Sequence, residues 1–114
     1  MSMKLTTREV SGVSIVDLSG KITLGEGGVA LREEVRKLLA EGKKKIVLNL
    51  AEVNYIDSSG LGELVSSYTA VKNAGGELKL LNLTSKVRDL LVITKLVTVF
   101  DVKDDEASAV GSFA

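Results

Sequence analysis

The spacing of apolar residues changes along the chain, and each change marks an expected element. Residues 5–10 and 13–18 alternate and are rich in Val, Ile and Thr, which favours strands. Residues 11–12, Ser-Gly, are a two-residue turn signal, so the strands are expected to pair as an antiparallel hairpin. Residues 21–24 continue or kink the second strand, and residues 25–28, Gly-Glu-Gly-Gly, predict a loop.

From residue 29 the apolar positions recur every three or four residues, which predicts an amphipathic helix ending at Gly42. Its buried stripe comprises Leu31, Val35, Leu38 and Leu39. The basic run at residues 43–45 could contact phosphate or an acidic partner, but a solvated lead-in to the next strand is favoured. Residues 46–50 are nearly all apolar, which is typical of a central strand covered on both faces. Residues 51–57 are expected to be a connection.

The second half of the chain alternates helices and strands. A helix is expected to open at Ser58 or Ser59, followed by a strand at residues 77–82 and a short helix capped by Thr84 or Ser85. Residues 97–102 predict a last strand, and a last helix follows. The apolar stripes of these three helices are Leu61, Leu64, Val65, Tyr68 and Val71, then Val87, Leu90 and Leu91, then Ala107, Val110 and Phe113.

This order of elements predicts the fold class. Alternating helices and strands require parallel crossovers, while the opening hairpin makes the sheet mixed. We therefore expect an α/β fold with a mixed sheet of about five strands, an N-terminal hairpin and four helices. The 114 residues are expected to form one domain, residues 1–114.

Composition excludes several classes of function. The chain has no Cys and no His, so it has no disulfide, no thiolate nucleophile, no Ser-His-Asp triad and no Cys- or His-ligated metal. Fifteen basic and fifteen acidic residues give a net charge of zero, so no basic face for nucleic acid is indicated. No apolar run is long enough for a membrane span and no secretory signal is visible, so a cytoplasmic location is expected. An enzyme is disfavoured, and no cofactor or metal is expected.

Two further segments have a chemical and a structural interpretation. The glycine-rich residues 25–28 lie where a phosphate loop would lie, but the spacing of the known phosphate motifs is absent, so a flexible loop is favoured. The three carboxylates at residues 104–106, Asp-Asp-Glu, could bind a hard cation. Negative charge at the N-terminus of the last helix is the favoured interpretation.

Residues 54–62, Asn-Tyr-Ile-Asp-Ser-Ser-Gly-Leu-Gly, are the strongest candidate for a functional site. They follow the most apolar strand and open a helix, where free amides and the helix dipole tolerate a phosphate. An N-cap needs only one residue of the type of Asp57, Ser58 or Ser59. Each glycine in a first turn lowers helix stability by about 1 kcal/mol, so Gly60 and Gly62 indicate a role beyond folding, such as close approach of another protein.

These residues resemble the signature of the STAS domain, a family that includes bacterial anti-sigma factor antagonists. The resemblance rests on residues 57–62, Asp-Ser-Ser-Gly-Leu-Gly, after the apolar strand at residues 46–50. It extends to residues 13–23, to the turn and strand start at residues 75–78, and to the third helix and last strand, so it covers nearly the whole chain.

The resemblance implies a regulatory switch. In such antagonists the serine directly after the aspartate, here Ser58, is phosphorylated by a partner that is both anti-sigma factor and serine kinase. The unphosphorylated antagonist binds that partner and frees the sigma factor, and a phosphatase resets the phosphorylated form. The implied partner surface comprises Asp57, Ser59, Gly60, Leu61, Gly62, Thr23 and Glu26.

One position departs from the family pattern. Thr23 stands where the antagonists commonly carry an aspartate, and Glu26 could supply the charge from a shifted position. The alternative function is that of a non-phosphorylated STAS subunit in a stress-signalling or lipid-transport ABC assembly. The intact pair Asp57 and Ser58 favours the phosphorylated switch.

Overall fold

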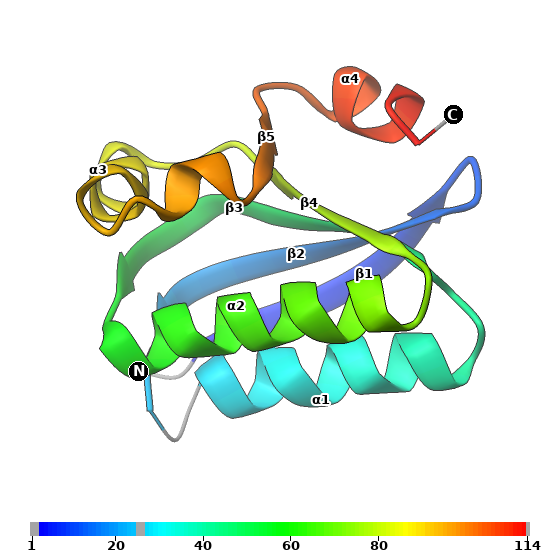
Figure 1. The fold of residues 1–114 in the computed structure, drawn as a ribbon, viewed down its shortest axis with the longest axis horizontal. Coiled ribbons are helices and arrows are strands. Elements are labelled where there is room, and N and C mark those ends of the chain that lie inside the picture. Colours follow the sequence, from blue (N-terminus) through cyan, green and yellow to red (C-terminus); the bar gives the residue numbers. More distant parts are fainter. Residues whose placement is uncertain (1–2, 25–26, 114) are drawn as a thin grey trace.

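The computed structural model describes residues 3–24 and 27–113. Its elements follow the expected order of hairpin, helix, strand, helix, strand, helix, strand and helix (Figure 1). In chain order they are β1 (Lys4–Val10), β2 (Val13–Ile22), α1 (Gly27–Ala40), β3 (Lys45–Ile56), α2 (Ser58–Asn73), β4 (Glu77–Leu81), α3 (Ser85–Ile93), the 3-10 helix η1 (Leu96–Thr98), β5 (Asp101–Lys103) and α4 (Glu106–Gly111).

The five strands form one sheet in the order β1-β2-β3-β4-β5. β1 runs antiparallel to β2, and every other neighbouring pair is parallel. The hairpin turns at Ser11 and Gly12, whose φ angles of 51° and 80° are the two positive values of a type I′ turn. The predicted α/β class, mixed sheet, hairpin and four helices are confirmed.

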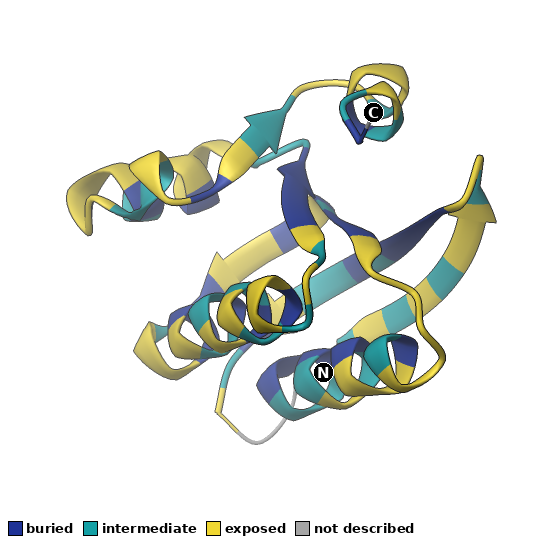
Figure 2. Cartoon of the chain, turned by 45° about the vertical axis from the view of Figure 1, so that its right-hand side comes forward, coloured by how far each residue is buried: buried dark blue, intermediate teal, exposed yellow. Residues whose placement is uncertain are grey.

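Helices cover both faces of the sheet. α1 and α2 lie side by side on one face, α4 lies on the other, and α3 packs against β3 (Figure 1). Figure 2 shows the buried positions on the inward faces of these elements. The larger core lies under α1 and α2, and the smaller one lies under α4 and comprises Val13, Ile15, Val47, Leu81, Ala109 and Phe113. Within residues 3–24 and 27–113, no helix combines the length and apolar character needed to cross a bilayer.

β3 is longer than the sequence pattern predicts. It continues to Ile56, so the connection expected at residues 51–57 is wrong except for Asp57. Its pairing with β4 stops at Asn49, while its pairing with β2 continues to Ile22, opposite Ile56, across two irregularities. The carboxyl end of β3 therefore extends past β4 together with β2.

The last strand is shorter than predicted. Instead of a strand over residues 97–102, the chain forms η1 and then β5, which has three residues. Lys95 has a φ of 63°, and the Val99 amide donates to the Leu96 carbonyl at 2.9 Å, so the backbone turns here. This turn places Phe100 in the core, with its ring edge-on to Tyr68 at 5.4 Å between centroids.

Two helices also differ from expectation in detail. α1 begins at Gly27, two residues early, and Gly27 and Gly28 are buried helix residues and not loop residues. A Cβ at Gly27 would overlap the Lys21 carbonyl, which explains the glycine. In α4 the core-facing alanine is Ala109, and the predicted Ala107 is exposed. The basic run at residues 43–45 is exposed, as predicted.

Candidate functional site

Asp57 joins the end of β3 to the start of α2. It is the N-cap of α2, and its Oδ1 accepts a hydrogen bond of 2.7 Å from the Gly60 amide. Its own amide donates to the Ile22 carbonyl at 3.3 Å. The end of β2 and the first turn of α2 are therefore bound to the same residue.

The loop after β2 lies against this cap. The Leu24 amide donates to Asp57 Oδ2 at 3.4 Å, and the Thr23 carbonyl accepts from the Gly28 amide at 3.1 Å. Leu24 is 78% exposed. The structure thus brings Thr23 next to the candidate site. Glu26 lies outside the described residues, so its role stays a prediction.

Ser58 and Ser59 are both exposed in the first turn of α2. Because Asp57 caps the helix, neither serine is needed as a cap, and within residues 3–24 and 27–113 neither hydroxyl makes a hydrogen bond. Ser59 also lines a small hollow with Thr23 and Leu24. The free first-turn amides and the helix dipole make this position tolerant of a negative group.

The residues after the serines play different parts. Gly60 is buried, and a Cβ there would overlap the Ile22 carbonyl, so the fold itself requires this glycine. Leu61 packs in the core with 9% of its surface exposed, and its part in partner binding stays a prediction. Gly62 is exposed, and a Cβ there would meet nothing within 4 Å. Of this trio, only Gly62 leaves open space at the surface.

Tyr55 is a surface residue that the sequence analysis did not single out. Its side chain is 48% exposed, and Lys21 Nζ lies 5.9 Å from the centre of its ring. Lys21, Asn54 and Lys86 line a hollow with it at the ends of the parallel strands. An aromatic residue in a short polar segment just before Asp57 was the available signal.

The three carboxylates at residues 104–106 do not converge. Asp105 caps α4, and the hydrogen bond from the Ser108 amide lowers the pKa of its carboxyl. Asp104 lies 3.4 Å from Arg88, and Glu106 lies 2.7 Å from Arg8. Among the described residues, no group of three or more acidic side chains could hold a metal ion. Of the three, Asp105 therefore serves the helix end in the way that the favoured interpretation predicts.

Arg8 connects the hairpin to α4. Its guanidinium donates to Asp17 at 2.6 Å and to Glu106 at 2.7 Å, and Asn49 donates to Asp17 at 2.8 Å. The hydrogen bond from Arg8 is the main reason that the pKa of each of these two carboxyls is lowered. This cluster lies on the sheet face opposite α1 and α2 and holds α4 in place.

Comparison with known proteins identifies the family. The STAS domain model matches residues 4–109. The anti-sigma-B factor antagonist of Bacillus subtilis is 37% identical over 87 residues, which cover 76% of this chain and 78% of that protein. The anti-sigma F factor antagonist of Paenibacillus polymyxa is 27% identical over 109 residues, 96% of this chain and 93% of that protein.

A solved structure supports the fold. An anti-sigma factor antagonist from Mycobacterium paratuberculosis superposes with a TM-score of 0.86 at 22% identity, covering 98% of this chain and 94% of that one. The phosphorylated form of the Bacillus cell fate determinant SpoIIAA superposes with a TM-score of 0.74 at 18% identity, over 97% and 100% of the two chains. The chain belongs to the STAS domain family, among relatives named anti-sigma factor antagonists, which are binding proteins and not enzymes.

Proposed function

We propose that this chain is an anti-sigma factor antagonist controlled by phosphorylation of Ser58. Unphosphorylated, it binds an anti-sigma factor that is also a serine kinase, and the sigma factor is freed. Phosphate on Ser58 ends that binding, and a phosphatase restores it. The relatives named as antagonists support the binding function, and the known phosphorylated form of SpoIIAA supports the modification.

The observation that carries the proposal is the exposed Ser58 hydroxyl beside an aspartate that is already the helix cap. Asp57 uses one carboxylate oxygen for Gly60 and the other for the loop after β2, so Ser58 is left available for chemistry. A kinase can reach this hydroxyl without unfolding the helix.

The surroundings of Ser58 explain how a phosphate would act. It adds about −1.5 to −2 charges, and the N-terminus of α2 stabilises negative charge. We therefore expect phosphorylation of Ser58 to leave the fold intact. The exposed apolar residues nearby, Leu24 and Tyr55, are suited to a contact surface, and a doubly charged group beside them would have to be desolvated on binding.

Phosphorylation by a candidate partner tests the proposal. The purified chain is incubated with ATP and the serine-kinase anti-sigma factor encoded nearest to it, and the modified residue is mapped by mass spectrometry. We expect one phosphate, absent in Ser58→Ala and retained in the matched variant Ser59→Ala. Isothermal titration should then show binding of the unmodified chain and none of the phosphorylated chain. Modification at Ser59 alone, or equal binding of both forms, would contradict the proposal.

A further inference from the structure

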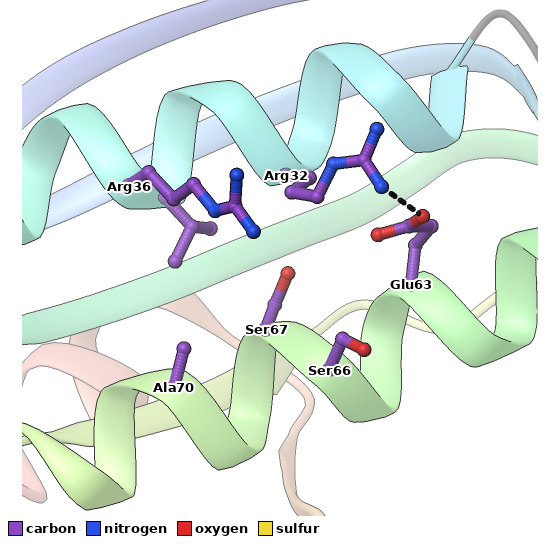
Figure 3. Close-up of a pocket in the computed structure, with 7 residues that line it drawn as sticks. Arg32, Arg36, Glu63, Ser66, Ser67 and Ala70 are labelled. Carbon is purple, nitrogen blue, oxygen red and sulfur yellow. Dashed lines mark hydrogen bonds and ion pairs between the residues drawn. The ribbon is translucent and has the colours of Figure 1, made fainter.

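A hollow of about 170 Å³ lies between α1 and α2, and five of its seven lining residues are polar (Figure 3). This volume is several times the ~30 Å³ that one water occupies in the liquid. The hollow exists because α2 presents short side chains to α1 at this level. The lining residues are Arg32, Val35 and Arg36 from α1, and Glu63, Ser66, Ser67 and Ala70 from α2.

Ser67 carries a buried hydroxyl that lacks a partner. The residue is only 3% exposed, and its Oγ makes no hydrogen bond within the described part of the chain. A serine hydroxyl inside a helix commonly bonds to the carbonyl four residues earlier, yet here it points into the hollow (Figure 3). A buried hydroxyl without a partner is unfavourable, so this one calls for an acceptor in the hollow.

Glu63 has a buried carboxylate oxygen that lacks a hydrogen-bond donor among the described residues. Its Oε2 accepts from Arg32 Nη1 at 3.1 Å, while its Oε1 is buried and has no donor among the described residues. Glu63 Oε1 and Ser67 Oγ are the two buried side-chain polar atoms without a partner in residues 3–24 and 27–113, and both line the same hollow.

Arg36 supplies the charge that a ligand would meet. Its side chain extends toward the hollow from α1, one turn after Arg32 (Figure 3). Arg32 is paired with Glu63, whereas Arg36 forms no ion pair with any described residue. The lining therefore has a net positive charge, and a guanidinium fork is well matched to an oxyanion.

We propose that this hollow binds a phosphate group that keeps one proton, as in hydrogen phosphate or a protonated phosphate monoester. Arg36 and Ser67 donate to its unprotonated oxygens, and its P–O–H donates to Glu63 Oε1. Sulfate has the same shape but no proton, so it would leave Glu63 Oε1 unpaired and facing an anion. The binding is non-covalent and does not require phosphate on Ser58, which does not line this hollow, although Arg32 and Glu63 also line the small hollow that contains Ser59.

An NMR titration at constant ionic strength tests the site. It is run near pH 6, about the second pKa of a phosphate monoester, with inorganic phosphate, glycerol 3-phosphate and sulfate in parallel. We expect saturable amide shifts at Arg36, Ser66 and Ser67 with phosphate, and sulfate affinity weaker by about tenfold, as expected for one charged hydrogen bond lost. Equal affinity for glycerol 3-phosphate assigns the site to monoesters, and binding of phosphate alone assigns it to the free ion.

Matched variants separate a built site from a surface effect. Arg36→Gln should weaken phosphate binding about tenfold, whereas the control Arg88→Gln, with the same charge change on α3, should not. Ser67→Ala should weaken binding several-fold without lowering the unfolding temperature. Glu63→Gln should erase the preference for phosphate over sulfate, because an amide can donate to sulfate. No saturable shift, equal affinity for sulfate, or binding that survives Arg36→Gln would overturn the proposal and leave the hollow to water.

Discussion

α2 and α4 begin in nearly the same way, but the polar groups beside their N-terminal caps differ in what they bind. Each has an aspartate cap, with Asp57 accepting from Gly60 at 2.7 Å and Asp105 accepting from Ser108 at 2.8 Å. At α4 the polar groups beside the cap have partners: the Ser108 hydroxyl donates to Asp105 at 2.9 Å, and Glu106 forms an ion pair with Arg8. At α2 the hydroxyls of Ser58 and Ser59 are exposed and form no hydrogen bond within the described residues 3–24 and 27–113.

The comparison shows that the cap alone carries no functional information. An aspartate before a helix stabilises the helix in both places. What sets α2 apart is the pair of exposed hydroxyls, the loop from β2 bound to the same aspartate, and the exposed Leu24 beside it. A functional helix end is therefore recognised by exposed polar groups that the fold itself does not need for hydrogen bonds or ion pairs.

The largest expected effect comes from placing a charge at each helix end. Ser58→Asp should weaken partner binding by at least about 100-fold, because a buried like charge or unpaired carboxylate costs several kcal/mol at an interface. Ala107→Asp, which adds the same charge at an exposed position in the first turn of α4, should leave binding unchanged. Both variants should melt within about 4 °C of the parent, a shift equal to roughly 1 kcal/mol or less in a domain of this size. Titration calorimetry and thermal unfolding measure the two effects, and unfolding of Ser58→Asp would contradict a surface mechanism.

The next effect concerns the glycines of the two helices. Gly60→Ala should destabilise the fold by about 1–3 kcal/mol or more, because the new methyl group would overlap the Ile22 carbonyl. Gly111→Ala in α4 is the control, since a Cβ there meets nothing within 4 Å. Denaturant unfolding distinguishes them, and equal stability of the two variants would show that β2 and α2 separate easily.

Acid should loosen the α4 end through its carboxylates. The pKa values of Asp17 and Glu106 are lowered in the folded chain, so their contribution to stability is present above the unfolded pKa and is lost as pH falls through the folded pKa. With no His or Cys in the chain, the unfolding temperature should stay level between about pH 5 and 8 and fall below about pH 4.

The variant Arg8→Gln checks the origin of that acid response. It removes the donor that lowers both pKa values, so its unfolding temperature should fall less steeply with acid than that of the parent. Hydrogen exchange should show α4 opening before the first turn of α2. An unchanged slope would mean that other carboxylates govern acid unfolding.

The smallest effect is expected at Gly62. A Cβ there meets open space and its φ is not positive, so Gly62→Ala should stabilise the fold by about 0.4–1 kcal/mol. If a partner approaches the first turn of α2 closely, the same variant should bind less tightly. Thermal unfolding and affinity are measured side by side, and a stabilised variant with full affinity would remove Gly62 from the proposed interface.

The fold was largely predictable because its apolar periods are clear, and the exceptions have local causes. The irregularity between Gly20 and Lys21 in the pairing of β2 with β3 lies opposite Val53 and Tyr55 and shifts the alternation there, so Val53 and Ile56 are buried three residues apart and do not look like a strand. At the other end, β-branched residues 97–99 favour a strand, but the chain turns there to bury Phe100, and tertiary packing outweighs local preference.

The candidate site was predictable in part. The aspartate cap and the exposed Ser58 follow from local sequence, since capping is a local property. The reason for Gly60 does not, because it depends on Ile22, which is 38 positions away and reaches α2 only through the sheet. Arg32 lies outside the apolar stripe of α1, yet its side chain is only 39% exposed because α2 presents Glu63 to it. The packing of two helices against each other cannot be predicted from the sequence of either helix alone.

The contact of Gly60 with the Ile22 carbonyl has a consequence for the timing of the proposed switch. Because the backbone of α2 packs directly against β2 at Gly60, we expect phosphorylation of Ser58 to leave the first turn in place. Modified and unmodified molecules would then differ only in the phosphate. The fraction of molecules able to bind the partner would follow the activities of the kinase and the phosphatase without a slow conformational step. The number of unmodified copies at any moment would therefore set how much partner is bound.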